Sequence, residues 1–410
     1  MTASATSAVT RDDVVRAARA VADVARHTPV LPSETLSERS GGQVLLKAEN
    51  LQRTGSFKIR GALNKLTALG DRAHAGVVAG SAGNHAQALA LAARARGVRC
   101  EVFMPAEAPI SKVEGAAALG AVVVQGSASV DDCNAAAAER AREAGLVLVH
   151  PFDDPDVVAG QGTLGLELVS DVPDLARVIV PVGGGGLVSG VAIAVKSARP
   201  DVQIVGVQTE ACAPVPASLR AGSPVPCSPA FLSIADGIAV KRPGDLTLAL
   251  IERWVDDVVV VAEDDIAEAM VLLAERAKLV VEGAGAVGAA ALLADAIAPA
   301  PAGTTVVVLS GGNVDAGLLA TVARRHETEA GRRIVVLTRV PDRPGSLAPL
   351  LQTIADTGAN LVEVEHVREG LDLHVRETAV QLVLETRGRA HAQEVLEAIA
   401  QAGYEARVVR

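Results

Sequence analysis

The sequence from Val178 to Leu187 reads VIVPVGGGGL and joins a β-branched apolar run to four consecutive glycines. The apolar run at 178–182 predicts a buried strand, and the Ala-rich stretch from Leu187 to Ala198 predicts the helix that follows it. The same alternation recurs along the chain, with strands predicted at 76–79, 98–104, 204–207 and 305–309 and a helix at 81–95. Because strands that alternate with helices imply parallel sheets covered on both faces, we predict an α/β fold for residues from about 41 to 315.

The alternation stops after Asp315, and the remaining residues predict a second domain. Strands are expected at Ile334–Arg339, Leu361–Val367, Ala379–Glu385 and Tyr404–Val409, and helices at Ser346–Thr357 and Ala390–Gln401. The order strand, helix, strand, strand, helix, strand is typical of a ferredoxin-like unit. We place the boundary near Ala330, which divides the chain into domains 1–329 and 330–410.

The composition excludes several classes of protein. Of the 410 residues, 50% are apolar and 21% are charged, so the chain has enough apolar surface to fold. The formal net charge is −10, and the aromatic residues are four Phe, one Tyr and one Trp. Both features argue against a nucleic-acid partner, since nucleic acids are bound by cationic side chains and aromatic platforms.

The cysteines and the terminal sequence predict a cytoplasmic protein. The four cysteines, Cys100, Cys133, Cys212 and Cys227, contain no C-x-x-C pair and no zinc spacing, so no metal is predicted. Scattered thiols of this kind are typical of core residues in a reducing compartment. Residues 1–10 show no secretory signal, and the longest uncharged run, 296–314, is broken by prolines and glycines, so no membrane span is expected.

Glycines 183–186 also predict a binding site. Residues without side chains allow backbone N–H groups to converge on a small anion, and the following helix adds the positive end of its dipole. A flexible turn is the alternative, although four glycines lose much conformational entropy for a turn alone. A second glycine motif, GAGAVG at 283–288, lacks the acidic residue of a dinucleotide site and is interpreted as close helix packing.

Lys58 lies within GSFKIRGA at 55–62, where Gly55 and Ser56 can open a helix. The positive end of a helix favours the neutral form of an amine, and the neutral amine is the form that reacts with carbonyl groups. A solvated surface lysine is the alternative that applies to any single lysine.

Two more loops place polar residues at the ends of predicted strands. Residues 81–87, SAGNHAQ, offer N–H groups and the side chains of Ser81 and Asn84 to a carboxylate, although either side chain could simply cap the helix. Ser310 begins the sequence SGGN after the strand predicted at 305–309, and its glycines alone would explain a tight turn.

Taken together, these segments resemble the fold-type II pyridoxal-phosphate (PLP) enzymes, in particular the threonine and serine ammonia-lyases, over nearly the whole chain. The resemblance implies two α/β subdomains, PLP as the cofactor and Lys58 as the catalytic lysine that carries it. The residues implied for cofactor binding are Phe57, Lys58, Asn84, Gly183, Gly184, Gly185, Gly186, Leu187, Gly237 and Ser310, and those for the substrate are Ser81, Ala82, Gly83, Asn84 and His85. In these roles Phe57 packs beside the cofactor ring, Asn84 forms a hydrogen bond with the ring oxygen, and Ser310 forms one with the ring nitrogen.

The resemblance implies α,β-elimination on L-threonine, giving 2-oxobutanoate and ammonia, with L-serine as a second small amino-acid substrate. Related serine racemases carry a second serine at the position of Ala82, and alanine cannot donate a proton, so racemisation is not expected. A serine racemase, a related PLP lyase and a non-catalytic amino-acid sensor are the alternatives. A role in isoleucine biosynthesis and one in threonine degradation both fit.

The last domain resembles an ACT domain, an amino-acid-sensing module, in the segment RVPDRPGSL at 339–347. Gly345 allows the chain to approach a ligand closely, and the helix that begins there offers N–H groups to a carboxylate. The resemblance implies an amino-acid effector and a homo-oligomer. A dimerisation unit without a ligand is the alternative.

Overall fold

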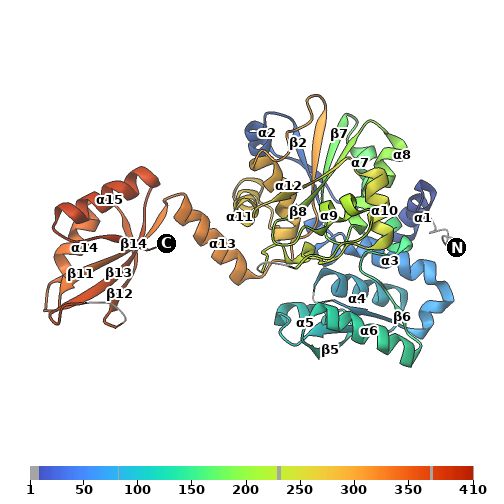
Figure 1. The fold of residues 1–410 in the computed structure, drawn as a ribbon, viewed down its shortest axis with the longest axis horizontal. Helices are drawn as coiled ribbons and strands as arrows, with labels where there is room; N and C mark the ends of the chain where they lie inside the picture. The colour runs from blue at the N-terminus through green and yellow to red at the C-terminus, as the bar shows by residue number, and fades with distance from the viewer. Residues whose placement is uncertain (1–8, 82, 229–231, 370–372, 410) are drawn as a thin grey trace. The chain divides into compact units, whose positions relative to one another are not determined.

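The computed structural model describes residues 9–81, 83–228, 232–369 and 373–409. The chain forms two compact units, Met1–Asp315 and Ala316–Arg410 (Figure 1). Helix α13 (Ala316–Glu329), which precedes the boundary expected near Ala330, is grouped with the second unit.

The larger sheet of the first unit has six strands in the order β1-β2-β10-β7-β8-β9. Their bounds are Val30–Pro32 (β1), Val44–Ala48 (β2), Leu175–Pro181 (β7), Gln203–Thr209 (β8), Asp257–Val261 (β9) and Thr304–Leu309 (β10). All neighbours pair in parallel except β1, which is antiparallel to β2. The predicted α/β class is therefore confirmed for this sheet.

Helices cover this sheet because its strands are apolar on both faces. Helix α12 (Gly283–Leu293) packs against β7, β8, β9 and β10, while α7 (Pro155–Asp171) and α8 (Gly186–Ala198) pack against each other (Figure 1). Further helices are α1 (Arg11–Val21), α2 (Glu34–Ser40), α3 (Lys58–Leu69), α9 (Pro214–Ala221), α10 (Asp245–Trp254) and α11 (Glu263–Leu272).

The smaller sheet of the first unit has the order β5-β4-β3-β6, and every pair is parallel. Its strands are Val77–Gly80 (β3), Cys100–Pro105 (β4), Val122–Ser127 (β5) and Val147–Leu148 (β6). Its helices are α4 (Asn84–Arg96), α5 (Ile110–Ala118) and α6 (Val130–Ala144). The first unit thus contains two α/β subdomains, as the family resemblance implied.

The glycines at 283–288 serve close packing, as the sequence indicated. A Cβ atom at Gly283 would lie 2.3 Å from the backbone oxygen of Ile234, and one at Gly285 would lie 2.6 Å from that of Gly311. Helix α12 therefore approaches neighbouring backbone at distances that any side chain would prevent.

The second unit has the predicted order of strands and helices. Its strands Arg333–Pro341 (β11), Asn360–Val367 (β12), Glu377–Glu385 (β13) and Arg407–Val409 (β14) form an antiparallel sheet in the order β12-β13-β11-β14. The helices α14 (Leu347–Asp356) and α15 (Arg389–Gln401) pack against each other. One core joins them to the sheet, with Val336, Leu350, Leu382, Val395 and Ile399 among its buried residues.

A buried ionic cluster ties β2, α3 and α7 together. Arg60 Nη2 lies 2.7 Å from Glu49 Oε1, and Arg60 Nη1 lies 2.6 Å from Glu167 Oε1. Lys47 Nζ lies 2.6 Å from Glu167 Oε2 and also donates to the backbone oxygen of Thr28. The side chains of Arg60, Glu49 and Lys47 are at most 1% exposed, so water does not screen these contacts.

The charges in this cluster depend on one another. Burial by itself raises the pKa of Glu49, but the charge and hydrogen bonds of Arg60 outweigh it and hold that pKa below its usual value. The pKa of Arg60 is raised in spite of its burial, because Glu49 and Glu167 face it. Both side chains therefore stay ionised in the folded protein.

Replacing Arg60 by leucine should destabilise the protein by about 3–5 kcal/mol, because Glu49 would be left charged and buried without its partner. Urea denaturation measures the free energy of unfolding. The matched control is Arg39→Leu, which removes the exposed ion pair with Glu268 and should cost less than about 1 kcal/mol. Equal stability of the Arg60→Leu variant and the parent would contradict the role given to the cluster.

Candidate active site

A cavity of about 690 Å³ lies between the two α/β subdomains of the first unit. The residues predicted for the site and found in its lining are Phe57, Lys58, Ser81, Gly83, Asn84, His85, Gly183, Gly184, Gly185, Gly186, Leu187, Gly237 and Ser310. Ala82, the remaining residue predicted for the site, lies outside the described residues. The fold therefore brings together segments that are far apart in the sequence.

Lys58 is the first residue of α3, as the sequence predicted for a helix opening. Its amine donates to the backbone oxygen of Pro151 at 3.0 Å and lies 5.3 Å from the centroid of the Phe57 ring. Its surroundings exclude water from the amine and lower the pKa of Lys58 to about 8, against the opposing charge of Glu282. About a tenth of this amine is therefore neutral at pH 7 and able to attack a carbonyl group.

The glycine loop joins β7 to α8 and leaves the start of α8 free of side-chain caps among the described residues. Gly185 has a φ of +97°, and a Cβ atom at Gly184 would lie 2.3 Å from the Phe152 ring. The hydroxyl of Thr247 donates to the backbone oxygen of Gly184 at 2.6 Å and holds the loop in place. The uncapped N–H groups at this helix start line the same cavity as Lys58 and are suited to bind an anion.

Asn84 takes part in a chain of hydrogen bonds that sets the orientation of its amide. Its Nδ2 donates to Glu282 Oε1 at 2.7 Å, and its Oδ1 accepts from Asn313 Nδ2 at 2.7 Å. Burial and the charge of Asp236 raise the pKa of Glu282 to about 7, although Asn84, Lys112 and Lys58 oppose the rise. Because both ends of the Asn84 amide are engaged, its orientation toward the cavity is defined.

Sequence reasoning missed Glu282 and Thr247. Glu282 is the only charged residue in the apolar stretch from Leu279 to Ala294, and this isolation was a signal that could have identified it. Thr247 carried no such signal, since it lies in an ordinary amphipathic helix and reaches the glycine loop only in the folded chain.

Two histidines line the cavity in neutral form. His85 pairs through Nε2 with the backbone oxygen of Val149 at 3.0 Å, and burial together with the charge of Lys58 lowers its pKa to about 3. His150 accepts through Nδ1 from the backbone N–H of Asp153 at 2.8 Å, and burial lowers its pKa as well. Neither imidazole is therefore a source of protons near neutral pH.

Ser310 follows β10 and supplies a neutral hydroxyl to the cavity. Its backbone oxygen accepts from the Phe57 N–H at 3.1 Å, which fixes the start of α3 to the end of β10. The hydroxyl is buried and makes one long contact of 3.5 Å to the backbone oxygen of Ala284, so it can bond a further group.

Two ion pairs connect the subdomains on either side of the cavity. Lys112 Nζ lies 3.0 Å from Asp236 Oδ2, and Lys241 Nζ lies 2.7 Å from Asp131 Oδ2. Each pair joins the smaller subdomain to the segment 236–242, which lines the cavity. The segment is therefore tied to the smaller subdomain at two points.

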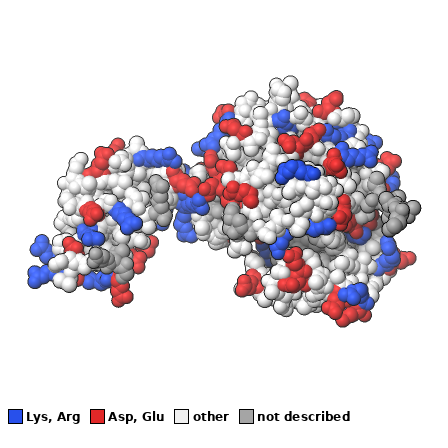
Figure 2. All heavy atoms as spheres, in the orientation of Figure 1, with Lys and Arg blue, Asp and Glu red and all other residues white. Residues whose placement is uncertain are grey.

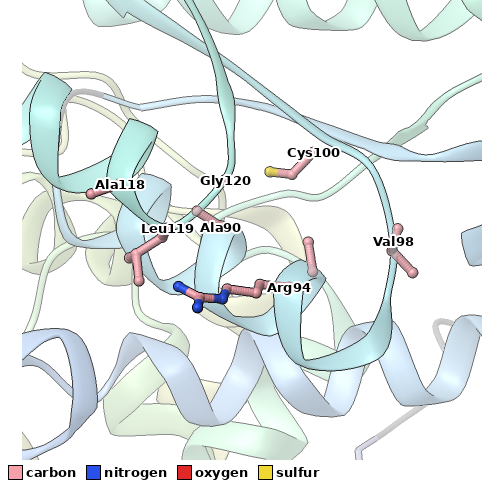
Figure 3. Close-up of a pocket in the computed structure, with 8 residues that line it drawn as sticks. Ala90, Arg94, Val98, Cys100, Ala118, Leu119 and Gly120 are labelled. Atoms are coloured by element: carbon pink, nitrogen blue, oxygen red, sulfur yellow. The ribbon is translucent and has the colours of Figure 1, made fainter.

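Three other observations bear on binding. A second hollow, of about 340 Å³, lies beside Ala90, Arg94, Val98, Cys100 and Leu119, and none of the predicted site residues lines it (Figure 3). On the face shown in Figure 2, the Lys and Arg side chains of the first unit are interspersed with Asp and Glu. In the described part of the chain no helix is long and apolar enough to cross a membrane.

The comparisons with known proteins agree with this geometry. A family model described as pyridoxal-phosphate dependent enzyme matches residues 21–311. The L-threonine ammonia-lyase of Thermotoga maritima is 44% identical over 404 residues, which are 98% of this chain and 100% of that protein. The L-threonine ammonia-lyase of Geobacter sulfurreducens is 46% identical over 380 residues, which are 92% of this chain and 94% of that protein.

Solved structures show the same relationship. The processed form of threonine deaminase isoform 2 from Solanum lycopersicum matches with a TM-score of 0.72 and 35% identity over 77% of this chain and 92% of that chain. Maize serine racemase matches with a TM-score of 0.73 and 36% identity over 78% of this chain and 99% of that chain. The chain belongs to the pyridoxal-phosphate-dependent enzyme family.

The cavity fits this cofactor by the chemistry of its groups. PLP carries an aldehyde, a phosphate and a pyridine nitrogen, and the cavity offers the amine of Lys58, the uncapped start of α8 and the hydroxyl of Ser310. The amine would bind the aldehyde, the helix start would bind the phosphate, and the hydroxyl would bond the pyridine nitrogen.

The rate at which PLP attaches covalently to the apoprotein should rise about tenfold per pH unit and level off near pH 8, because only the neutral amine of Lys58 reacts. Glu282→Gln removes a negative charge that raises the pKa of Lys58, so the midpoint should move to lower pH. Stopped-flow absorbance between pH 6 and 9.5 measures the attachment rate and the midpoint of its pH dependence. Glu268→Gln, at an exposed carboxylate, should leave the midpoint in place. An unchanged midpoint in Glu282→Gln would contradict the claim that the charge of Glu282 raises the pKa of Lys58.

Proposed function

We propose that the protein converts L-threonine to 2-oxobutanoate and ammonia by α,β-elimination, and that L-serine is a second substrate. The observation that carries this proposal is the partly neutral amine of Lys58 in the same cavity as an anion-binding helix start and an uncharged Ser310. Two relatives that match over more than nine-tenths of this chain are named L-threonine ammonia-lyase and support it.

In this proposal separate groups of residues bind separate parts of the cofactor. Gly183 to Leu187 hold the cofactor phosphate, Asn84 and Ser310 bond the ring, and Phe57 packs beside it. When bound, PLP withdraws electrons from the α-carbon of the substrate. A neutral hydroxyl at Ser310 does not keep the ring nitrogen protonated, which suits loss of a β-substituent better than transamination.

Lys58 is the base that removes the proton of the α-carbon. The electron pair of that C–H bond forms the new double bond as the β-hydroxyl leaves with a proton as water. The enamine that results then takes up water and loses ammonia. The substrate carboxylate lies at the start of α4, where Ser81, Gly83 and Asn84 line the cavity and no side chain caps the helix among the described residues.

Elimination is favoured over racemisation. A racemase needs a second group that exchanges a proton on the opposite face of the substrate, and Ala82 has none to offer. The neutral His85 and His150 do not replace it. L-Serine lacks one methyl group of L-threonine, a difference worth about 1–3 kcal/mol, so it remains a substrate.

The PLP-loaded protein should release 2-oxobutanoate from L-threonine and pyruvate from L-serine, measured by a coupled lactate dehydrogenase assay. Lys58→Ala should lower kcat more than about 10³-fold, because the base that takes the α-proton is lost. Lys278→Ala, at a lysine outside the cavity, is the control and should keep full activity. Unconsumed L-threonine with bound cofactor, or D-serine as the main product from L-serine, would refute the proposed reaction.

We further propose that residues 330–410 form an ACT domain that binds an amino-acid effector. The order of its strands and helices supports this assignment, as does the loop before α14. In this loop Gly345 has a φ of +83° with open space at its Cβ position, and the Ser346 hydroxyl is buried without a hydrogen-bond partner among the described residues. An unpartnered hydroxyl beside a helix start is suited to bind a carboxylate or ammonium group.

Isoleucine or valine at millimolar concentration should change the KM for L-threonine about fivefold or more in the full chain. Gly345→Val fills the open space and strains a loop backbone whose φ is +83°, so it should abolish this response while the activity without effector stays unchanged. Gly317→Ala, at an equally open glycine, should keep the response. Steady-state kinetics measure the change in KM, and calorimetric titration measures binding of the effector. A response that persists in Gly345→Val would place the effector elsewhere.

A further inference from the structure

Two cysteine sulfurs meet beside the cavity, outside the groups used in the proposed reaction. Cys212 Sγ and Cys227 Sγ lie 3.0 Å apart, although the two residues are 15 positions apart in the sequence. Cys212 follows β8, and Cys227 follows α9, so that the helix lies between them in the chain. Both are free thiols in the structure.

The backbone holds both cysteines in place. The Cys212 N–H donates to the backbone oxygen of Thr209 at 3.0 Å, and the Cys227 N–H donates to that of Lys241 at 2.8 Å. Between them, the hydroxyl of Ser218 accepts from the Val225 N–H at 2.9 Å and closes the turn after α9. The approach of the two sulfurs is therefore set by ordered structure on each side.

The two thiols differ in exposure. Cys212 is buried, and this burial together with the neighbouring Cys227 raises the pKa of Cys212 to about 12. Cys227 is half-buried and open to a small oxidant. Because Cys227 is the more exposed of the two, it is the thiol that an oxidant reaches first, and Cys212, whose sulfur lies 3.0 Å away, is placed to resolve the product.

We propose that Cys212 and Cys227 are a modification site at which a hydroperoxide forms a reversible intramolecular disulfide. The Cys227 thiolate attacks one oxygen of hydrogen peroxide, the O–O bond breaks, and a sulfenic acid and hydroxide result. The Cys212 sulfur then attacks the Cys227 sulfur, and the S–O bond breaks with release of water. Overall two thiols and one hydrogen peroxide give one disulfide and two water molecules, and a reduced dithiol reverses the change.

The disulfide would bear on the cavity through Lys241. Pro226 and Lys241 line the cavity, and the backbone of Lys241 is bonded to Cys227. The Lys241 side chain in turn pairs with Asp131 of the opposite subdomain. A bond between the sulfurs closes the chain from Cys212 to Cys227 into a loop and fixes this part of the cavity wall to the sheet.

Ordinary core packing and metal binding are the other interpretations of the pair. Packed thiols would stay reduced under peroxide. For a metal ion, the described residues offer no group of three His, Cys, Asp or Glu side chains, so the two sulfurs lack further ligands. Disulfides in reducing compartments are typical of redox sensing, and the two sulfurs here lie 3.0 Å apart.

The PLP-loaded full chain, treated with hydrogen peroxide and then with iodoacetamide, tests the proposal by peptide mass spectrometry. We expect a cross-linked pair of peptides containing Cys212 and Cys227, a loss of alkylation at both, and full recovery with dithiothreitol. The midpoint of thermal unfolding should rise by about 2 °C or more on oxidation, because the unfolded chain is constrained.

Two variants distinguish a disulfide at this pair from oxidation elsewhere in the chain. Cys227→Ser, at a half-buried position, should show neither the cross-link nor the thermal shift, whereas Cys100→Ala, at a buried thiol with no sulfur beside it among the described contacts, should show both. Continued alkylation of Cys212 and Cys227 after peroxide, oxidation of Cys227 to the sulfinic acid, or a disulfide between two chains on a non-reducing gel would each overturn the proposal.

Discussion

The constraint on which the site depends is the withdrawal of one amine, that of Lys58, from water. Loss of hydration disfavours the charged form of a lysine and lowers its pKa to about 8 here, even though the carboxylate of Glu282 opposes the shift. An amine in this state reacts with carbonyl compounds and accepts protons near neutral pH. The same exclusion of water keeps the neighbouring His85 neutral.

The position of the amine rests on the elements that hold α3. Arg60, two residues after Lys58, joins Glu49 after β2 to Glu167 on α7, and these charges are paired although they are buried. The N–H of Phe57 is bonded to Ser310 at the end of β10. Lys58 therefore lies between an ionic anchor on one side and the large sheet on the other, which restricts the direction in which it points.

Much of the fold could be predicted because its signals are local. The β-branched runs, the glycines after β7 and the opening of α3 at Lys58 are visible within a few residues of sequence. The contacts that complete the site are not local. Asn84 and Glu282 are separated by 198 residues, and Lys241 and Asp131 by 110, so no periodicity relates them. Thr247 was missed for this reason, whereas Glu282 did carry a local signal, its isolation in an apolar stretch.

By itself the sequence determined the α/β class of the first unit and the ferredoxin-like order of the second. Those features depend on residue type, hydrophobic period and turn chemistry, which act over short distances. Only the tertiary structure decided the ionisation of Lys58, Glu282 and His85 and the meeting of Cys212 with Cys227. Hydration and charge at these groups depend on what the whole chain packs around them.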